Sequence, residues 1–151
     1  MKRAIIVFHL LLVWTAMVSA LPMKQDAGRF AVAGLNDRET EAFFASFKEA
    51  VAKGEKRKVA AMVSYPIRVT VKSGRRMRLS NAAAFIKTYD QIFYDEFKEL
   101  IAKTESKDLW AKSAGVATPR GEVWFAGIVR DGNDLDKYEI KIIALNGPIR
   151  L

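Results

Sequence analysis

The sequence has no cysteine, and its single histidine, His9, lies near the N-terminus. Without thiols the chain cannot form disulfides, use a thiolate nucleophile or build the usual cysteine-ligated zinc sites. If the segment around His9 is removed on export, as argued next, the mature domain has no imidazole either. Ser-His-Asp and Cys-His hydrolysis, zinc hydrolysis and most iron or copper sites are then excluded. We expect no cofactor and no metal, and any catalysis would depend on carboxylates, Tyr, Lys or Arg.

The N-terminal segment has the three parts of a secretory signal peptide. Lys2-Arg3 is a positive start, an apolar run covers residues 4–14, and Val18-Ser19-Ala20 has the pattern of a cleavage site. An uncleaved membrane anchor is disfavoured, because a spanning helix needs about 20 apolar residues and polar side chains interrupt this run. We therefore predict that residues 1–20 are a signal peptide, cleaved after Ala20, and that the protein is periplasmic or extracellular.

The charge of the chain is strongly basic. Its 151 residues include 25 basic and 17 acidic side chains, which gives a net charge of +8. Loss of residues 1–20, which contain Lys2 and Arg3 and no acid, would leave 23 basic residues and a net charge of +6. An exported basic domain is attracted to phospholipid or lipopolysaccharide head groups, acidic glycans or an acidic protein. Nucleic acid is not expected as a partner, and a membrane would be met at its surface and not spanned.

Residues 37–151 are predicted to form a single α+β domain, preceded by a flexible lead-in over residues 21–36, which lack a sustained period. Apolar residues at helical spacing predict three helices in the N-terminal half. They run from the capping residue Asn36 to Gly54, over residues 56–64 with Tyr65-Pro66 as the end, and over residues 82–103 after the cap Ser80-Asn81.

Alternation of apolar and polar residues predicts strands in the rest of the domain. These are a hairpin of residues 67–71 and 76–79, an ambiguous stretch over 105–111, a second hairpin over 116–129 with a turn at Thr118–Gly121, and a strand over 137–145. The hairpin formed by residues 67–79 has one buried and one basic face. Helices gathered ahead of an antiparallel meander predict three helices packed on one face of a curved antiparallel sheet.

Three stretches carry a resemblance to a known family. They are Ser64–Val69 before the first hairpin, Phe85–Phe93 on the long helix, and Gly115-Val116 with Gly121–Phe125 in the sheet. In this order, after a signal peptide, they resemble the NTF2-like superfamily, also grouped with cystatin-like architectures, and in it the small exported bacterial proteins of unestablished function. The resemblance covers nearly all of residues 37–146, and it implies a cone-shaped α+β domain that commonly forms a homodimer through a sheet face. The superfamily contains enzymes as well as binding domains, so the fold does not decide the function.

The hairpin formed by residues 67–79 carries five cations, which are the candidate residues for binding an anion or a partner: Arg68, Lys72, Arg75, Arg76 and Arg78. Arginine makes paired hydrogen bonds to phosphate or carboxylate, so this hairpin could hold an anionic head group or enter an acidic site of another protein. The alternative is a solvated outer strand whose charges prevent pairing with other chains.

The long helix carries the candidate catalytic residues Tyr89, Asp90, Tyr94 and Asp95. A buried Tyr–Asp pair could polarise a carbonyl or abstract a proton if burial raised the pKa of the Asp. The alternative is a core tyrosine beside solvated acids that pair with nearby lysines.

Four aromatic residues are candidates for lining an apolar pocket: Trp110, Trp124, Phe125 and Tyr138. The alternative is that they are core residues of the sheet. Trp124 and Phe125 are adjacent, so in a regular strand they point to opposite faces. One of them would then lie on the outer face, where a second subunit could bind.

Residues 131–136 have a superficial likeness to a calcium-binding loop. They lack the twelfth-position Glu and the flanking helices of such a loop, so we interpret them as a hairpin turn.

We interpret the chain as an exported, non-catalytic domain that binds an apolar or anionic small molecule or an envelope protein. One alternative is a cofactor-free enzyme of isomerase or dehydratase type that uses a Tyr/Asp pair in the cone cavity. Another alternative is an inhibitor or immunity-type protein that acts through the basic hairpin.

Overall fold

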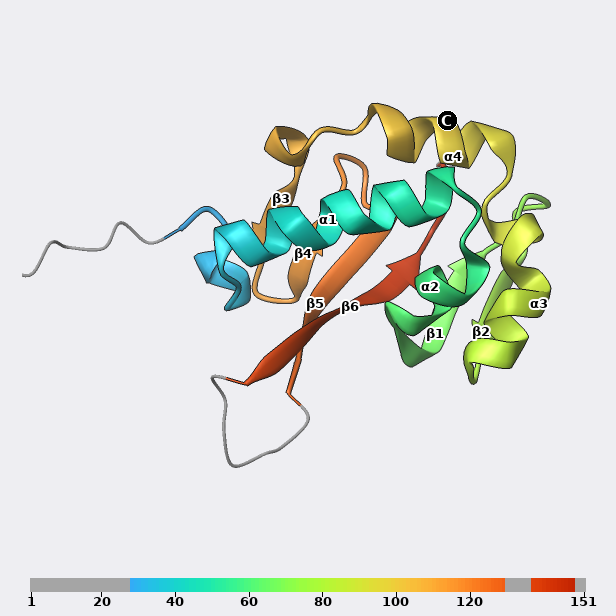
Figure 1. The fold of residues 1–151 in the computed structure, drawn as a ribbon, viewed down its shortest axis with the longest axis horizontal. Helices are drawn as coiled ribbons and strands as arrows, with labels where there is room; N and C mark the ends of the chain where they lie inside the picture. The colour runs from blue at the N-terminus through green and yellow to red at the C-terminus, as the bar shows by residue number, and fades with distance from the viewer. Residues whose placement is uncertain (1–27, 130–136, 149–151) are drawn as a thin grey trace, which may run out of the picture.

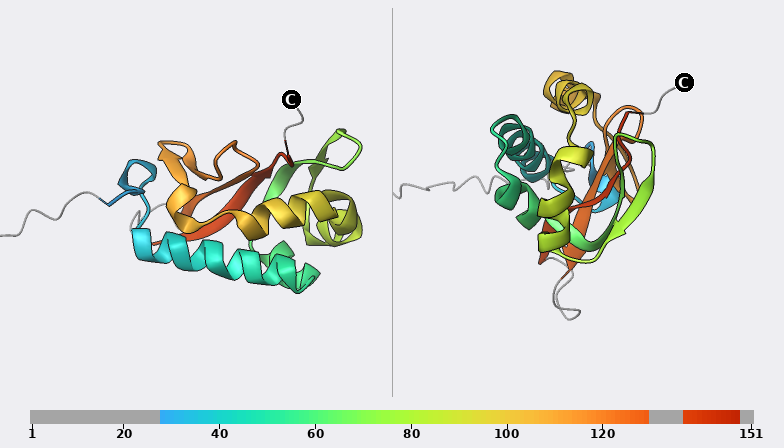
Figure 2. Two further views of the ribbon diagram at one scale, coloured as in Figure 1. Left: turned by 90° about the horizontal axis from the view of Figure 1, so that it is seen from above. Right: turned by 90° about the vertical axis from the view of Figure 1, so that its right-hand side faces the viewer.

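In residues 28–129 and 137–148, which this computed structural model describes, four α-helices lie on one face of a curved six-stranded sheet (Figures 1 and 2). The helices are α1 (Asp37–Ala52), α2 (Lys56–Ala61), α3 (Ala82–Ile92) and α4 (Asp95–Lys103), with two 3-10 turns, η1 (Ala31–Ala33) and η2 (Ser106–Asp108). The strands are β1 (Val63–Thr70), β2 (Arg76–Leu79), β3 (Trp110–Lys112), β4 (Gly115–Ala117), β5 (Val123–Val129) and β6 (Tyr138–Leu145). The predicted α+β class is confirmed.

The strands lie in the order β2-β1-β6-β5-β4-β3. Strands β3 to β6 form the predicted antiparallel meander. The hairpin of β1 and β2 joins this meander through β1, which pairs with β6 in parallel. The prediction of a wholly antiparallel sheet is therefore wrong at this one junction, because the β1–β6 contact depends on packing between distant segments and not on a turn.

The helix-covered face of the sheet holds the hydrophobic core. Phe125 of β5 is fully buried, and its ring stacks on that of Phe44 at a centroid distance of 6.1 Å. Helix α1 is capped by Asn36, whose side chain accepts a hydrogen bond from the backbone N–H of Glu39, as its sequence pattern predicts. The buried side of α1 includes Phe47. Its ring centroid lies 6.2 Å from that of Phe93, the residue at the end of α3. The first contact attaches α1 to the sheet, and the second attaches α1 to the end of α3.

The predicted long helix over residues 82–103 is interrupted at Phe93 and Tyr94, which separate α3 from α4. In a continuous helix the carbonyl of Gln91 would accept a hydrogen bond from residue 95. Here it accepts one from the backbone N–H of Lys72 at 2.9 Å, so the β1–β2 hairpin takes over the role of the next helical turn. Both Phe93 and Phe97 remain buried, with their rings stacked at 5.7 Å.

The second predicted helix is also shorter than expected. Helix α2 ends at Ala61, and the residues before Pro66 already belong to β1. Proline cannot donate a ladder hydrogen bond. The register between β1 and β6 shifts between Val63 and Arg68, which accommodates Pro66 inside the strand.

The prediction of a flexible lead-in is wrong for its last part, residues 28–36. Phe30 is fully buried and Leu35 is nearly so. The carboxylate of Asp37 accepts hydrogen bonds from the backbone N–H groups of Arg29 and Phe30, and these bonds hold its pKa below the ordinary value. The signal peptide prediction, the rest of the lead-in and the turn at residues 131–134 lie outside the described residues.

Candidate functional site

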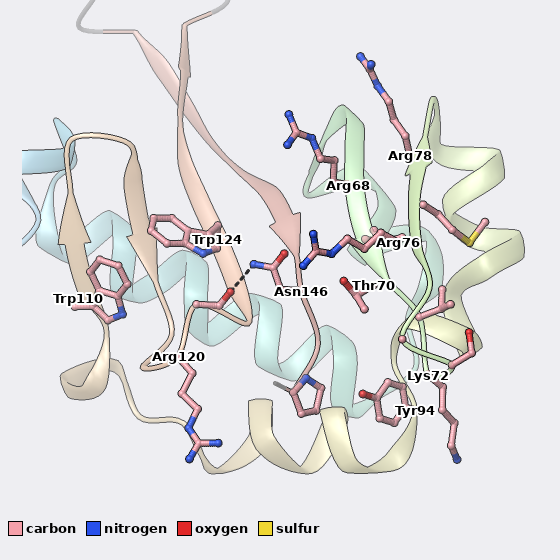
Figure 3. Close-up of a pocket in the computed structure, with 17 residues that line it drawn as sticks. Arg68, Thr70, Lys72, Arg76, Arg78, Tyr94, Trp110, Arg120, Trp124 and Asn146 are labelled. Atoms are coloured by element: carbon pink, nitrogen blue, oxygen red, sulfur yellow. Dashed lines mark hydrogen bonds between the residues drawn. The ribbon is translucent and has the colours of Figure 1, made fainter. Parts of the chain in front are cut away.

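The sheet has a second face that the helices do not cover, here called the open face (Figure 2). Side chains alternate between the two faces along each strand. On β5, Phe125 points into the core while its neighbour Trp124 is half-buried on the open face, as predicted (Figure 3). On β1, Ile67 and Val69 are buried, whereas Arg68 between them is exposed. The open face is therefore built from the residues that the core does not use.

The strand register aligns six residues in one row across the open face. In order from β3 to β2, this row is Trp110, Ala117, Trp124, Ala144, Arg68 and Arg78. Neighbouring strands are about 4.8 Å apart, so the backbones of Trp124 and Arg68 are separated by roughly 10 Å. Two indoles thus occupy one half of the open face and two arginines the other.

A basin of about 900 Å³ lies on the open face and separates these two halves (Figure 3). Five cations line it: Arg68, Lys72, Arg76, Arg78 and Arg120. Among the described residues no Asp or Glu lines the basin. Its central polar group is Asn146, which lies between Trp124 and Arg76 in Figure 3. The basin therefore combines positive charge with an amide and an aromatic wall.

All five predicted cations of the β1–β2 hairpin are exposed, and none forms an ion pair with another described residue. Arg68 lies directly opposite Arg78 in the strand register, and Arg76 lies opposite Thr70. Like charges that face each other across a strand pair are destabilising. Arg75 is the one member of the predicted set that does not line the basin.

Two cations at the aromatic end of the open face were missed by the sequence reasoning. Arg120 lines the basin from the turn before β5. The ammonium group of Lys112 on β3 lies 4.6 Å from the ring centroid of Trp124, within the range of a cation–π contact. Their distance in sequence from the hairpin hides this grouping, because only the order of the strands brings them to the same face.

The four predicted aromatic residues divide between three places. Trp110 and Trp124 line the basin, and their rings meet edge to face at a centroid distance of 5.1 Å. Phe125 belongs to the core. Tyr138 lines a separate hollow of about 640 Å³ between α1 and β6, where its hydroxyl donates a hydrogen bond to the carboxylate of Glu39 at 2.9 Å.

The turn between β4 and β5 positions both indoles. Glu122 is only 2% exposed, and its carboxylate accepts hydrogen bonds from the Thr118 hydroxyl at 2.6 Å and from the Arg120 backbone N–H at 3.2 Å. The carbonyl of Thr118 in turn accepts the indole N–H of Trp110 at 2.9 Å. Gly121 has a φ of +76°, and a Cβ there would lie only 2.9 Å from the indole nitrogen of Trp124. This turn therefore determines where the aromatic wall lies.

Asn146, the residue that follows β6, is hydrogen-bonded to the same turn. Its backbone N–H donates to the carbonyl of Glu122 at 2.7 Å. Its side-chain amide donates to the carbonyl of Gly121, also at 2.7 Å (Figure 3). The amide group is therefore held in a defined orientation at the centre of the basin.

The structure does not assemble the predicted catalytic Tyr–Asp pair. Tyr89 is 1% exposed and its hydroxyl has no hydrogen-bond partner, while Asp90 is exposed and pairs with Lys56 at 2.6 Å. Asp95 is fully exposed at its side chain, 3.7 Å from Lys98. Neither carboxylate lines the basin, so we do not retain the mechanism that depended on such a pair.

Burial raises the pKa of Tyr89 to about 12, and the carboxylate of Asp90 adds to this rise. A phenol in this state keeps its proton at neutral pH. Tyr94 does line the basin, and the ammonium group of Lys72 lies 5.8 Å from its ring centroid.

The fold and the site together define an α+β domain with a basic and aromatic basin on the open face of its sheet. No family model, no curated protein and no solved structure matches the chain. Within residues 28–129 and 137–148, no helix has the length and apolar character needed to cross a membrane. The same residues contain no cluster of His, Asp or Glu side chains suited to a metal ion.

Proposed function

We propose that this protein is an exported binding domain that holds an anionic small molecule in the basin on its open face. The observation that carries this proposal is the grouping of five cations around one basin of about 900 Å³ that no described acid lines. Arginine guanidinium groups bind phosphate and carboxylate with paired hydrogen bonds. The rigid amide of Asn146 adds a polar group of defined orientation.

Repulsion within the basin supports the same proposal. Arg68 and Arg78 face each other, and no described Asp or Glu lines the basin around them. Their repulsion destabilises the folded domain, and a bound anion would reduce it. A solvated outer strand does not need its cations gathered with Arg120, which comes from the other half of the sheet. The concave shape favours a ligand that enters this protein over an acidic partner that the hairpin would enter.

The finer assignment of the fold and the cellular location belong to the same proposal. We infer an NTF2-like cone, which the order of helices and hairpins and the helix-covered curved sheet support. Export is supported by the charged start, the apolar run and the small residues that precede position 21. A homodimer through the open face is not favoured, because it would bring two basic basins together.

The experiment is a fluorescence titration of the full chain with the substitution Trp14→Phe. The three tryptophans are Trp14, Trp110 and Trp124, so the remaining emission comes only from the basin. We expect inorganic phosphate to change this emission saturably, with a Kd on the order of 1 mM, at constant ionic strength. Chloride at the same ionic strength should have no such effect.

Two double variants with the same loss of charge provide the control. Arg68→Gln with Arg76→Gln should abolish the phosphate response, because both residues line the basin. Arg38→Gln with Arg57→Gln removes two exposed arginines from helices α1 and α2 and should leave it unchanged. An equal loss in both variants would show general charge attraction and would contradict the proposal.

A further inference from the structure

The cationic and aromatic halves of the basin are close enough for one small molecule to touch both. Trp124 and Arg68 lie two strands apart in the same cross-strand row, with the small residue Ala144 between them. Two strand spacings amount to roughly 10 Å. A ring in van der Waals contact on both of its sides needs about 7 Å, twice a carbon–carbon contact of about 3.5 Å. The span between the two backbones exceeds this width, so it leaves room for one ring and for an anionic group attached to that ring.

The aromatic half is rigid and remains accessible. Trp110 is 38% exposed although its indole N–H is bonded to the Thr118 carbonyl. Trp124 is held between the edge of Trp110, the ammonium group of Lys112 and the bare Cα of Gly121. Accessible indoles that have already lost their rotational freedom lose little entropy when a ligand packs against them.

The arrangement of these indoles also favours a small-molecule ligand over a lipid surface. Side chains that dock onto a bilayer project their apolar ends outward into the headgroup region. Here the two rings lie side by side over the sheet and form one wall of the basin (Figure 3). Their position is that of a pocket wall, opposite the arginines.

We propose that the ligand is an anion attached to a flat ring, with the ring packed against Trp124 and Trp110 and the anionic group bound by Arg68 and Arg76. This inference rests on the proposed function and adds the aromatic half of the ligand. Asn146, which lies between the two halves in Figure 3, then faces the bond that joins ring and anion. Aromatic packing of this kind strengthens binding by about tenfold.

The test compares 1-naphthyl phosphate with inorganic phosphate by isothermal titration calorimetry on the full chain. We expect 1-naphthyl phosphate to bind about tenfold more tightly than phosphate. Trp124→Leu should remove this preference and leave phosphate binding intact, whereas Arg68→Gln with Arg76→Gln should remove binding of both. Circular dichroism should confirm that each variant is folded. If Trp124→Leu fails to fold, Trp110→Leu, which replaces the more exposed of the two indoles, takes its place.

The outcomes separate the two proposals. Equal affinity for the two phosphates would contradict the proposal of an attached ring and would still support the anion site. Absence of binding by both overturns the anion site and the ring together. Binding of anionic phosphatidylglycerol vesicles that is lost in Trp124→Leu, without any preference for 1-naphthyl phosphate, would assign the indoles to a membrane surface and overturn the inference.

Discussion

The two faces of the sheet differ in what the same strands contribute to them. On the helix-covered face, Phe125, Ile67 and Val69 are fully or almost fully buried and belong to one continuous core. On the open face, their immediate neighbours Trp124 and Arg68 line a solvent-accessible basin. A strand with period two can thus supply stability on one face and a site on the other. Mutations should therefore affect stability and binding separately, according to the face on which they lie.

The largest expected effect tests this separation on two adjacent residues of β5. Phe125→Ala removes a fully buried ring and should lower the free energy of unfolding by about 3–5 kcal/mol. Trp124→Ala removes a half-buried ring whose main aromatic contact is Trp110, and should cost only about 1 kcal/mol. Urea unfolding followed by far-UV circular dichroism measures both. Equal losses would show that the open face is a second core and would contradict the prediction.

The next effect concerns Glu122, the buried acid of the turn that positions the indoles. Glu122→Ala should lower the free energy of unfolding by about 1–3 kcal/mol, because the Thr118 hydroxyl and the Arg120 N–H lose their acceptor. The near-UV circular dichroism of Trp110 should change in the same variant, since Thr118 holds its indole. Glu99→Ala, which removes an exposed partner of Lys103, is the control and should alter neither property. An unchanged near-UV spectrum in Glu122→Ala would show that the turn does not position the indoles.

On the core side, the buried phenol of Tyr89 and the half-buried phenol of Tyr65 predict that stability is sensitive to alkaline pH. Burial raises the pKa of both Tyr65 and Tyr89 to about 12 in the folded state, above the unfolded value of about 10. Their contribution to the free energy of unfolding is therefore fully present below pH 10 and is lost as the pH rises towards 12. Urea midpoints measured at pH 9 and pH 11 should differ, and Tyr89→Phe should reduce that difference.

The same two tyrosines form a matched pair at neutral pH. Tyr65→Phe removes a hydrogen bond to the Ala60 carbonyl and should cost about 1 kcal/mol. Tyr89→Phe removes a buried hydroxyl that has no partner, so it should cost nothing. A clear loss of stability in Tyr89→Phe would reveal a hydrogen bond to that hydroxyl in solution.

The smallest effect has the opposite sign and belongs to the open face. Arg78→Gln removes the like charge opposite Arg68 and should raise the free energy of unfolding by about 0.5 kcal/mol without phosphate. Addition of phosphate should stabilise the unmodified chain more than this variant. A thermal melt with and without phosphate measures both changes. Destabilisation of the variant in the absence of phosphate would show that the two arginines do not repel each other.

Much of the fold follows from local patterns. The cap at Asn36, the alternation around Arg68 and the opposed directions of Trp124 and Phe125 all depend on residues a few positions apart. The errors arose where a distant segment intervened. The long helix is interrupted at Phe93, where Lys72 bonds to a helix carbonyl, and residues 28–36 pack against the domain because the core accepts Phe30.

The candidate site was predictable only in part. The five cations of the hairpin and the two tryptophans could be named from their residue types and spacing. Arg120 and Lys112 could not, because nothing near them in the sequence indicates that they share a face with the hairpin. The Tyr–Asp pair failed for a related reason, since helical spacing left the direction of Asp90 undecided until α2 brought Lys56 to it.

Local sequence patterns were enough to predict which residues of each element face the core and which face outward. That property depends on the helical and strand periods, and these act within a few residues. Which outward-facing residues became neighbours depended on how distant segments pack together. The parallel contact of β1 with β6 placed the arginines of the hairpin two strands from Trp124. Strand order is the result of packing between distant segments in a shared core, so a basin assembled across it has no local signature.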